Sequence, residues 1–166
     1  MKAVLFHLED EGVFHFWYEP MLSFGLDTLL YVDRGQNPYD YPQTDEMAYT
    51  RFEEIREALK TYPRMHWVFF EPDYDIERQS SVTPISLHDF EHPKDDFIYV
   101  FGADRGWDEV WGINPKHAEY VFIPGISLRA VNAASMVLWD RQAKEQRAML
   151  DGETLEALRR RQFAGG

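Results

Sequence analysis

The chain has 166 residues, of which 45% are hydrophobic and 16% aromatic, enough to fill the core of one domain. It has no cysteine, which excludes a disulfide framework, a thiolate nucleophile and a cysteine-ligated metal site. Its formal net charge is −12, so nucleic-acid phosphates are repelled unless a local basic patch compensates. No apolar run approaches the roughly 18–20 residues that span a bilayer, and charges follow the first apolar run too closely for a signal peptide. We therefore expect a cytoplasmic protein without membrane contact.

The charge is unevenly distributed along the chain. Residues 1–140 carry 11 Lys and Arg against 25 Asp and Glu, whereas residues 141–166 carry 6 against 4. We expect a single domain over residues 1–166, with 141–166 as a basic C-terminal helical tail. Its cations are Arg141, Lys144, Arg147 and the run Arg159–Arg161. They indicate either an RNA-binding patch or a solvated helix end, where cations interact favourably with the helix dipole.

In chain order, the first half is predicted to alternate strands and helices. A strand over Lys2–Leu8 precedes a short helix over Pro20–Leu26 and a second strand over Thr28–Val32. After a loop over 33–43, a long helix is predicted over 44–62, because apolar residues recur at spacings of three and four. These residues are Ala48, Phe52, Ile55, Leu59 and Tyr62.

The second half continues the alternation. The apolar runs His66–Glu71, Asp96–Gly102 and Ala118–Pro124 predict buried strands, with a short element at Ile85–Phe90. Helices are predicted over Ser127–Arg141 and Gly152–Gln162. Alternating helices and near-continuous apolar strands are typical of an α/β fold with a mostly parallel sheet flanked by helices.

Two of these strands end in glycine-containing turns. Such turns let main-chain N–H and C=O groups approach a ligand closely, which is how α/β sheets bind adenine-containing cofactors. The first turn follows the strand ending at Phe101 and reads Gly102-Ala103-Asp104-Arg105-Gly106. The second reads Ile123-Pro124-Gly125-Ile126-Ser127-Leu128, followed by Arg129 and Asn132 in a helix.

In this order and separation the two turns resemble motifs two and three of the SpoU (TrmH-like) branch of the SPOUT superfamily of RNA methyltransferases. The matching residues are Phe101, Gly102, Asp104, Gly106, Ile123, Pro124, Ser127, Leu128, Asn132 and Ala133. The run Leu22–Val32, with Phe24 and Gly25, also resembles the family's helix–FG–strand passage after motif one. The resemblance covers about residues 20–142.

The resemblance implies a C-terminal deep trefoil knot, a homodimer, and S-adenosylmethionine as the cofactor. Carried over residue by residue, the cofactor would be bound by Phe70, Glu71, Gly102, Asp104, Gly106, Ile123, Gly125 and Leu128. Ser127, Arg129 and Asn132 would lie near the methyl acceptor as the catalytic residues. The implied activity is methylation of an RNA ribose 2′-hydroxyl, with tRNA or rRNA as substrate.

The chain departs from the family in motif one. The positions of the family's Asn and Arg fall at Val13 and Glu19, and a carboxylate repels a phosphate that a guanidinium would bind. Arg129 is one candidate for the missing guanidinium, and Arg34 and Arg105 are others, although each also fits a surface ion pair. An alternative function therefore stays open: a catalytically inactive homodimer of this fold that binds the cofactor or a protein partner in a regulatory role.

Two further segments carry weaker functional signals. His88 and His92 are spaced for a metal site on a helix, but Pro84 and Pro93 flank them and no third ligand is evident, so a loop or surface role is the preferred interpretation. The aromatic run Phe14–Tyr18 offers rings that could stack on a base, and core packing or a dimer contact is the preferred interpretation.

Overall fold

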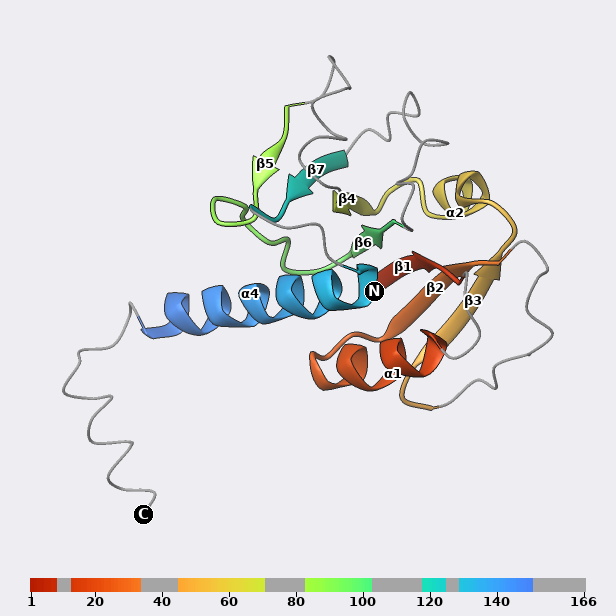
Figure 1. The fold of residues 1–166 in the computed structure, drawn as a ribbon, viewed down its shortest axis with the longest axis horizontal. Coiled ribbons are helices and arrows are strands. Elements are labelled where there is room, and N and C mark those ends of the chain that lie inside the picture. Colours follow the sequence, from red (N-terminus) through yellow and green to blue (C-terminus); the bar gives the residue numbers. More distant parts are fainter. Residues whose placement is uncertain (9–12, 34–44, 71–82, 103–117, 125–128, 151–166) are drawn as a thin grey trace.

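The computed structural model describes residues 1–8, 13–33, 45–70, 83–102, 118–124 and 129–150. Seven strands form one sheet with three helices packed beside it (Figure 1). The strands are β1 (Lys2–His7), β2 (Thr28–Val32), β3 (Ala48–Phe52), β4 (His66–Phe70), β5 (Ile85–Ser86), β6 (Phe97–Phe101) and β7 (Ala118–Phe122). The helices are α1 (Val13–Ser23), α2 (Ile55–Thr61) and α4 (Ala130–Leu150).

The strand order is β3-β2-β1-β6-β4-β7-β5, and all six pairings are parallel. This confirms the predicted mostly parallel α/β sheet. The central strand β6 is buried at all five residues, as expected for a strand covered on both faces. Because all strands run in one direction, their carboxyl ends share one edge of the sheet, which we call the carboxyl edge.

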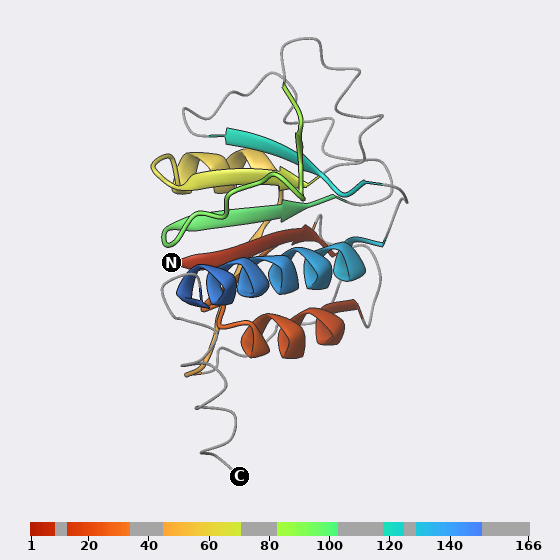
Figure 2. The ribbon, with the colours of Figure 1, turned by 90° about the vertical axis from the view of Figure 1, so that its left-hand side faces the viewer.

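Helices cover the two faces of the sheet unequally. α1 and α4 lie side by side on one face, with α2 on the other (Figures 1 and 2). On the α1–α4 face, Trp17 stacks on Phe6 with ring centroids 4.2 Å apart. Both rings are buried, and truncating such an aromatic to alanine typically costs about 3–5 kcal/mol. This stack anchors α1 to β1.

The predicted helix over 44–62 is wrong in its first half. Ala48–Phe52 form β3, which pairs with β2 from Thr28–Ala48 to Val32–Phe52, and only Ile55–Thr61 are helical. Apolar residues of β3 and α2 happen to be spaced three and four apart across the strand–helix junction, which is also the pattern of one amphipathic helix. Main-chain pairing with β2 supplies strand hydrogen bonds that local propensity does not anticipate.

The other helices differ mainly in their bounds. α1 begins at Val13 rather than Pro20 and ends in a turn at Gly25, whose φ is +75°. α4 begins three residues later than predicted and extends to Leu150. The predicted helix over 152–162 and the segments that would form a knot, 103–117 and 125–128, lie outside the described residues. No helix in the described part of the chain is long and apolar enough to cross a membrane.

Candidate cofactor and acceptor site

The carboxyl ends of β6, β4 and β7 lie next to one another in register. Phe70, the last residue of β4, pairs with Phe101 at the end of β6 and with Val121 near the end of β7. Gly102 follows Phe101 directly, and Ile123 follows two residues after Val121. The structure therefore brings Phe70, Gly102 and Ile123 to one part of the carboxyl edge.

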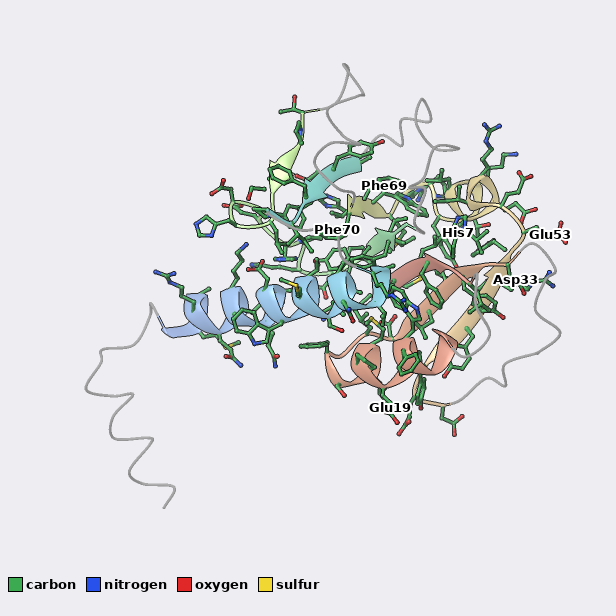
Figure 3. All side chains as sticks on the ribbon, in the orientation of Figure 1. His7, Glu19, Asp33, Glu53, Phe69 and Phe70 are labelled. Carbon is green, nitrogen blue, oxygen red and sulfur yellow. The ribbon has the colours of Figure 1, made fainter. Side chains whose placement is uncertain are left out.

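The Phe70 side chain is committed to the hydrophobic core. Its ring stacks on Phe101 with centroids 4.9 Å apart and meets Phe90 and Tyr99 edge-on. Figure 3 shows Phe69 and Phe70 at the sheet. A ligand at this edge would therefore contact the main chain of Phe70 rather than its ring. Gly102 is half-buried and has no side chain to block approach.

The start of α4 carries the described part of the predicted acceptor side. The Arg129 carbonyl accepts hydrogen bonds from the N–H groups of Asn132 and Ala133, both at 3.0 Å. The side chains of Arg129 and Asn132 are exposed. Ile123 is half-buried and packs against the core on the α1–α4 face. Arg129 thus stands at a helix N-terminus, where the main chain favours anions.

Six of the predicted site residues lie outside the described residues. They are Glu71, Asp104, Gly106, Gly125, Ser127 and Leu128. Their roles stay predictions, as do those of Arg34 and Arg105 as suppliers of a guanidinium.

The motif-one positions both fall in α1. Glu19 is exposed on that helix (Figure 3), and its carbonyl accepts a hydrogen bond from Ser23 Oγ at 2.8 Å. A solvated carboxylate there supplies no cation for an acceptor phosphate. The family's motif-one arginine thus has no counterpart at this position.

Sequence reasoning missed an ion pair between a buried carboxylate and an exposed guanidinium at the other end of the carboxyl edge. Asp33, directly after β2, is only 3% exposed, and its Oδ2 lies 3.6 Å from Nε of Arg51 in β3. Arg51 Nη2 also donates to the Asp33 carbonyl oxygen at 3.2 Å. The sequence offers one signal for this pair, the carboxylate of Asp33 at the end of the apolar run of β2. Its partner Arg51 can be recognised only when β3 is known to be a strand.

The His88–His92 segment is not helical, and His92 takes part in a side-chain network with α4 and β6. Its Nδ1 lies 2.6 Å from the Tyr99 hydroxyl and its Nε2 2.9 Å from Asp140 Oδ2. Burial lowers the pKa of His92, against the opposing effect of Asp140. Within the described ranges, no group of three or more His, Cys, Asp or Glu side chains could hold a metal ion. The contacts of His92 therefore indicate a role in stabilising the fold rather than in binding a metal.

Two cations of the proposed basic patch are used inside the protein. The Arg141 guanidinium lies 5.0 Å from the Phe97 ring centroid and donates to the Lys94 carbonyl oxygen. Lys144 Nζ donates to the carbonyl oxygens of Leu87 and Phe90. Both cations thus make contacts within the protein, which differs from both a free surface patch and a fully solvated helix end. Arg147 is exposed, and Arg159–Arg161 lie outside the described residues.

Solved structures with a similar fold include RNA methyltransferases and a SpoU methyltransferase. No protein-family model matches the chain, and no curated protein is similar in sequence. The structure of the SpoU methyltransferase AviRb from Streptomyces viridochromogenes with AdoMet gives a TM-score of 0.63 at 15% identity over 86% of this chain. This chain spans only 57% of the AviRb chain.

Two more structures agree. The structure of ribosomal RNA small subunit methyltransferase E from Neisseria gonorrhoeae, bound to S-adenosyl methionine, gives a TM-score of 0.58 at 15% identity. The match covers 86% of this chain and 66% of that one. A structure described as giving insights into the 2-OH methylation of C/U34 on tRNA gives a TM-score of 0.61 at 16% identity. The match covers 88% of this chain and 91% of that one. At such identities the likeness is one of fold.

Proposed function

We propose that this chain, which has the fold of the SpoU (TrmH-like) RNA methyltransferases, is an S-adenosylmethionine-dependent methyltransferase that acts on a ribose 2′-hydroxyl of tRNA or rRNA. One observation carries the proposal: β6, β4 and β7 end in register, which brings Phe70, Gly102 and Ile123 together at the carboxyl edge. In open parallel α/β sheets, ligands bind beyond the carboxyl ends of the strands.

The described residues fit such a cofactor. Gly102 offers an approachable main chain at the end of the central strand, beside the main chain of Phe70 and the half-buried Ile123. We assign Glu71, Asp104, Gly106, Gly125 and Leu128 to the same site. S-adenosylmethionine, when bound, would supply an electrophilic methyl group. The role of this chain's residues is then to hold it and to orient an acceptor oxygen toward it.

On the acceptor side we assign Ser127, Arg129 and Asn132. The Arg129 side chain is exposed at the start of α4, where a guanidinium can bind a phosphate of the acceptor. It would thus take over part of the role that the carboxylate of Glu19 cannot fill. We also propose a cytoplasmic location, where tRNA and rRNA substrates occur.

We further propose that the chain forms a C-terminal trefoil knot and a homodimer. The knot would be formed by the last strands and the helix that follows them, and a crystal structure of the protein tests it. The homodimer is supported by large exposed apolar side chains on neighbouring helices, Phe16 on α1 and Met136 and Trp139 on α4. Exposed apolar patches of this kind are typical of protein interfaces.

The alternative is a catalytically inactive homodimer of the same fold that binds cofactor or a protein partner as a regulatory module. The exposed Glu19 at the motif-one arginine position favours it, as does the net negative charge of the chain. A methyl-transfer assay with labelled cofactor and unmodified tRNA or rRNA separates the two functions. Label on RNA supports the enzyme, whereas cofactor binding without transfer to either RNA supports the inactive module.

The first test is calorimetric titration with S-adenosylmethionine and S-adenosylhomocysteine. We expect micromolar binding by the wild-type chain and none by Gly102→Val, whose added side chain would occupy the approach to the main chain. Ala48→Val is the matched control, since it enlarges an exposed residue of β3 on the far side of the sheet. Absence of binding by the wild-type chain would refute the methyltransferase proposal.

A further inference from the structure

Arg51 is a guanidinium held in place at the carboxyl edge by a buried carboxylate. Asp33 is 3% exposed and contacts Arg51 twice, through its side chain at 3.6 Å and its carbonyl oxygen at 3.2 Å. Asp33 is itself fixed by its N–H, which donates to the Phe52 carbonyl oxygen at 2.9 Å. The Arg51 side chain is nevertheless 44% exposed. The arginine is therefore both ordered and open to solvent.

The contacts of Arg51 leave part of its hydrogen-bonding capacity unused. Guanidinium has five N–H donors, and within the described ranges the contacts of Arg51 involve Nε and Nη2 but not Nη1. An ordered guanidinium loses less side-chain entropy when it binds a phosphate. Ion pairs at a surface usually contribute little to stability. Joining β2 to β3 is therefore a weak explanation for the Asp33–Arg51 pair.

The position of Arg51 fits a contact with the substrate backbone rather than with the reacting group. β3 is three strands away from β6, which at about 4.8 Å a strand amounts to roughly 14 Å from the strand that ends at Gly102. Figure 3 shows His7 and Asp33 along this part of the edge, with Glu53 beyond them. We propose that Arg51, anchored by Asp33, binds a backbone phosphate of the RNA that flanks the methylated nucleotide. This inference rests on the proposed function.

The test is binding of unfractionated tRNA to the full chain, measured by fluorescence anisotropy at several salt concentrations. Arg51→Ala is expected to weaken binding about three- to ten-fold at low salt and to reduce the slope of log K against log salt by about 0.7–0.9, the value for one phosphate contact. Arg51→Lys, which keeps the charge, should restore most of the slope. Urea unfolding of each variant checks that the fold is intact.

Arg64→Ala is the matched control for charge. Arg64 is exposed in the turn before β4, at the opposite edge of the sheet, and its removal changes net charge equally. We expect its salt slope to equal that of the wild type.

If the wild-type chain does not bind tRNA, the same measurements are made with rRNA. Three outcomes would overturn the inference: equal effects of Arg51→Ala and Arg64→Ala, an unchanged slope for Arg51→Ala, or no binding of either RNA by the wild-type chain. Cofactor titration of the same variants distinguishes failure of the Arg51 inference from failure of the proposed function. Arg51→Ala should bind S-adenosylmethionine as the wild type does. A chain that binds cofactor but shows no Arg51 effect keeps its methyltransferase assignment and loses only this contact.

Discussion

His92 Nε2 lies 2.9 Å from Asp140 Oδ2, and the imidazole is only 4% exposed. Because a carboxylate can only accept, Nε2 carries the hydrogen in this bond, and the neutral ring then accepts at Nδ1 from the Tyr99 hydroxyl at 2.6 Å. Lys144 completes the network with a 2.8 Å ion pair to Asp140. The loop before β6, the strand itself and α4 are thereby joined through one histidine.

This environment predicts that the protein loses stability at mildly acidic pH. Burial, helped by Lys144 and Arg141, lowers the pKa of His92 below 6.5, against the opposing effect of Asp140. The unfolded chain therefore binds the proton more readily than the folded chain. The stabilisation is complete above the unfolded pKa of about 6.5 and is lost as pH falls through the folded pKa, with a slope of at most about 1.4 kcal/mol per pH unit for one proton.

Urea unfolding of the wild-type chain and of His92→Gln between about pH 8 and pH 4.5, a range that brackets the histidine pKa, checks this prediction. We expect the variant to be less stable at the alkaline end and to show a shallower decline with acid. His88→Gln, an exposed histidine of the same loop, is the matched control and should follow the wild-type curve. Identical slopes for wild type and His92→Gln would contradict the prediction.

Removing the Tyr99 hydroxyl should destabilise the fold through His92. Tyr99 is buried, and the same burial raises its pKa, so the phenol stays protonated as a donor. Tyr99→Phe leaves the buried Nδ1 of His92 without that donor, at a cost of about 1–3 kcal/mol. Tyr62→Phe, a half-buried tyrosine on the other face, should cost less than about 0.5 kcal/mol. Thermal or urea unfolding at neutral to alkaline pH distinguishes the two, and equal costs would argue against a Tyr99–His92 bond.

The C-terminus of α1 leads to a third stability prediction. The N–H groups of Gly25 and Leu26 donate to the carbonyl oxygens of Leu22 and Met21 at 2.9 and 3.0 Å, the pattern of a Schellman cap. Gly25 has φ +75°, and a Cβ added there would meet no atom within 4 Å, so only backbone strain opposes substitution. We expect Gly25→Ala to cost about 1 kcal/mol and Gly25→Asn less. A Gly25→Asn variant less stable than Gly25→Ala in urea would show that the cap is not the cause.

The strands could be predicted from sequence because a parallel sheet buries both faces of each strand, which gives apolar runs such as Phe97–Phe101. β3 could not be predicted, because its identity depends on pairing with β2 rather than on its own pattern, and 15 residues separate the two strands along the chain. Because β3 was predicted as a helix, the pairing of Arg51 with Asp33 could not be recognised from the sequence. At the candidate site, the glycine-containing segments pointed to the ends of two strands, and the structure places Gly102 and Ile123 at one edge of the sheet. Their cofactor-binding roles stay predictions.

Polar networks were the least predictable feature. The spacing of His88 and His92 suggests a local pair, whereas the partner of His92, Asp140, is 48 residues away and is brought to it by the packing of α4. Arg141 and Lys144 have the pattern of surface cations because a basic tail is usually solvated. Their stems and charged groups instead pack and bond against the loop before β6, a use that only the tertiary structure reveals.

The proposed homodimer is tested most directly at Trp139, which is 65% exposed on α4 beside α1, where Phe16 is 66% exposed. Rings this large and this exposed are unfavourable in water and are frequent anchors of interfaces. We expect the wild-type chain to sediment at twice its 19.6 kDa mass and Trp139→Glu to shift toward the monomer, because a buried unpaired carboxylate opposes association. Lys60→Glu on α2, at the opposite face, makes the matched change to Glu and should leave the dimer intact. A monomeric wild-type chain, or a Trp139→Glu dimer as stable as the wild type, would show that this surface is not the interface.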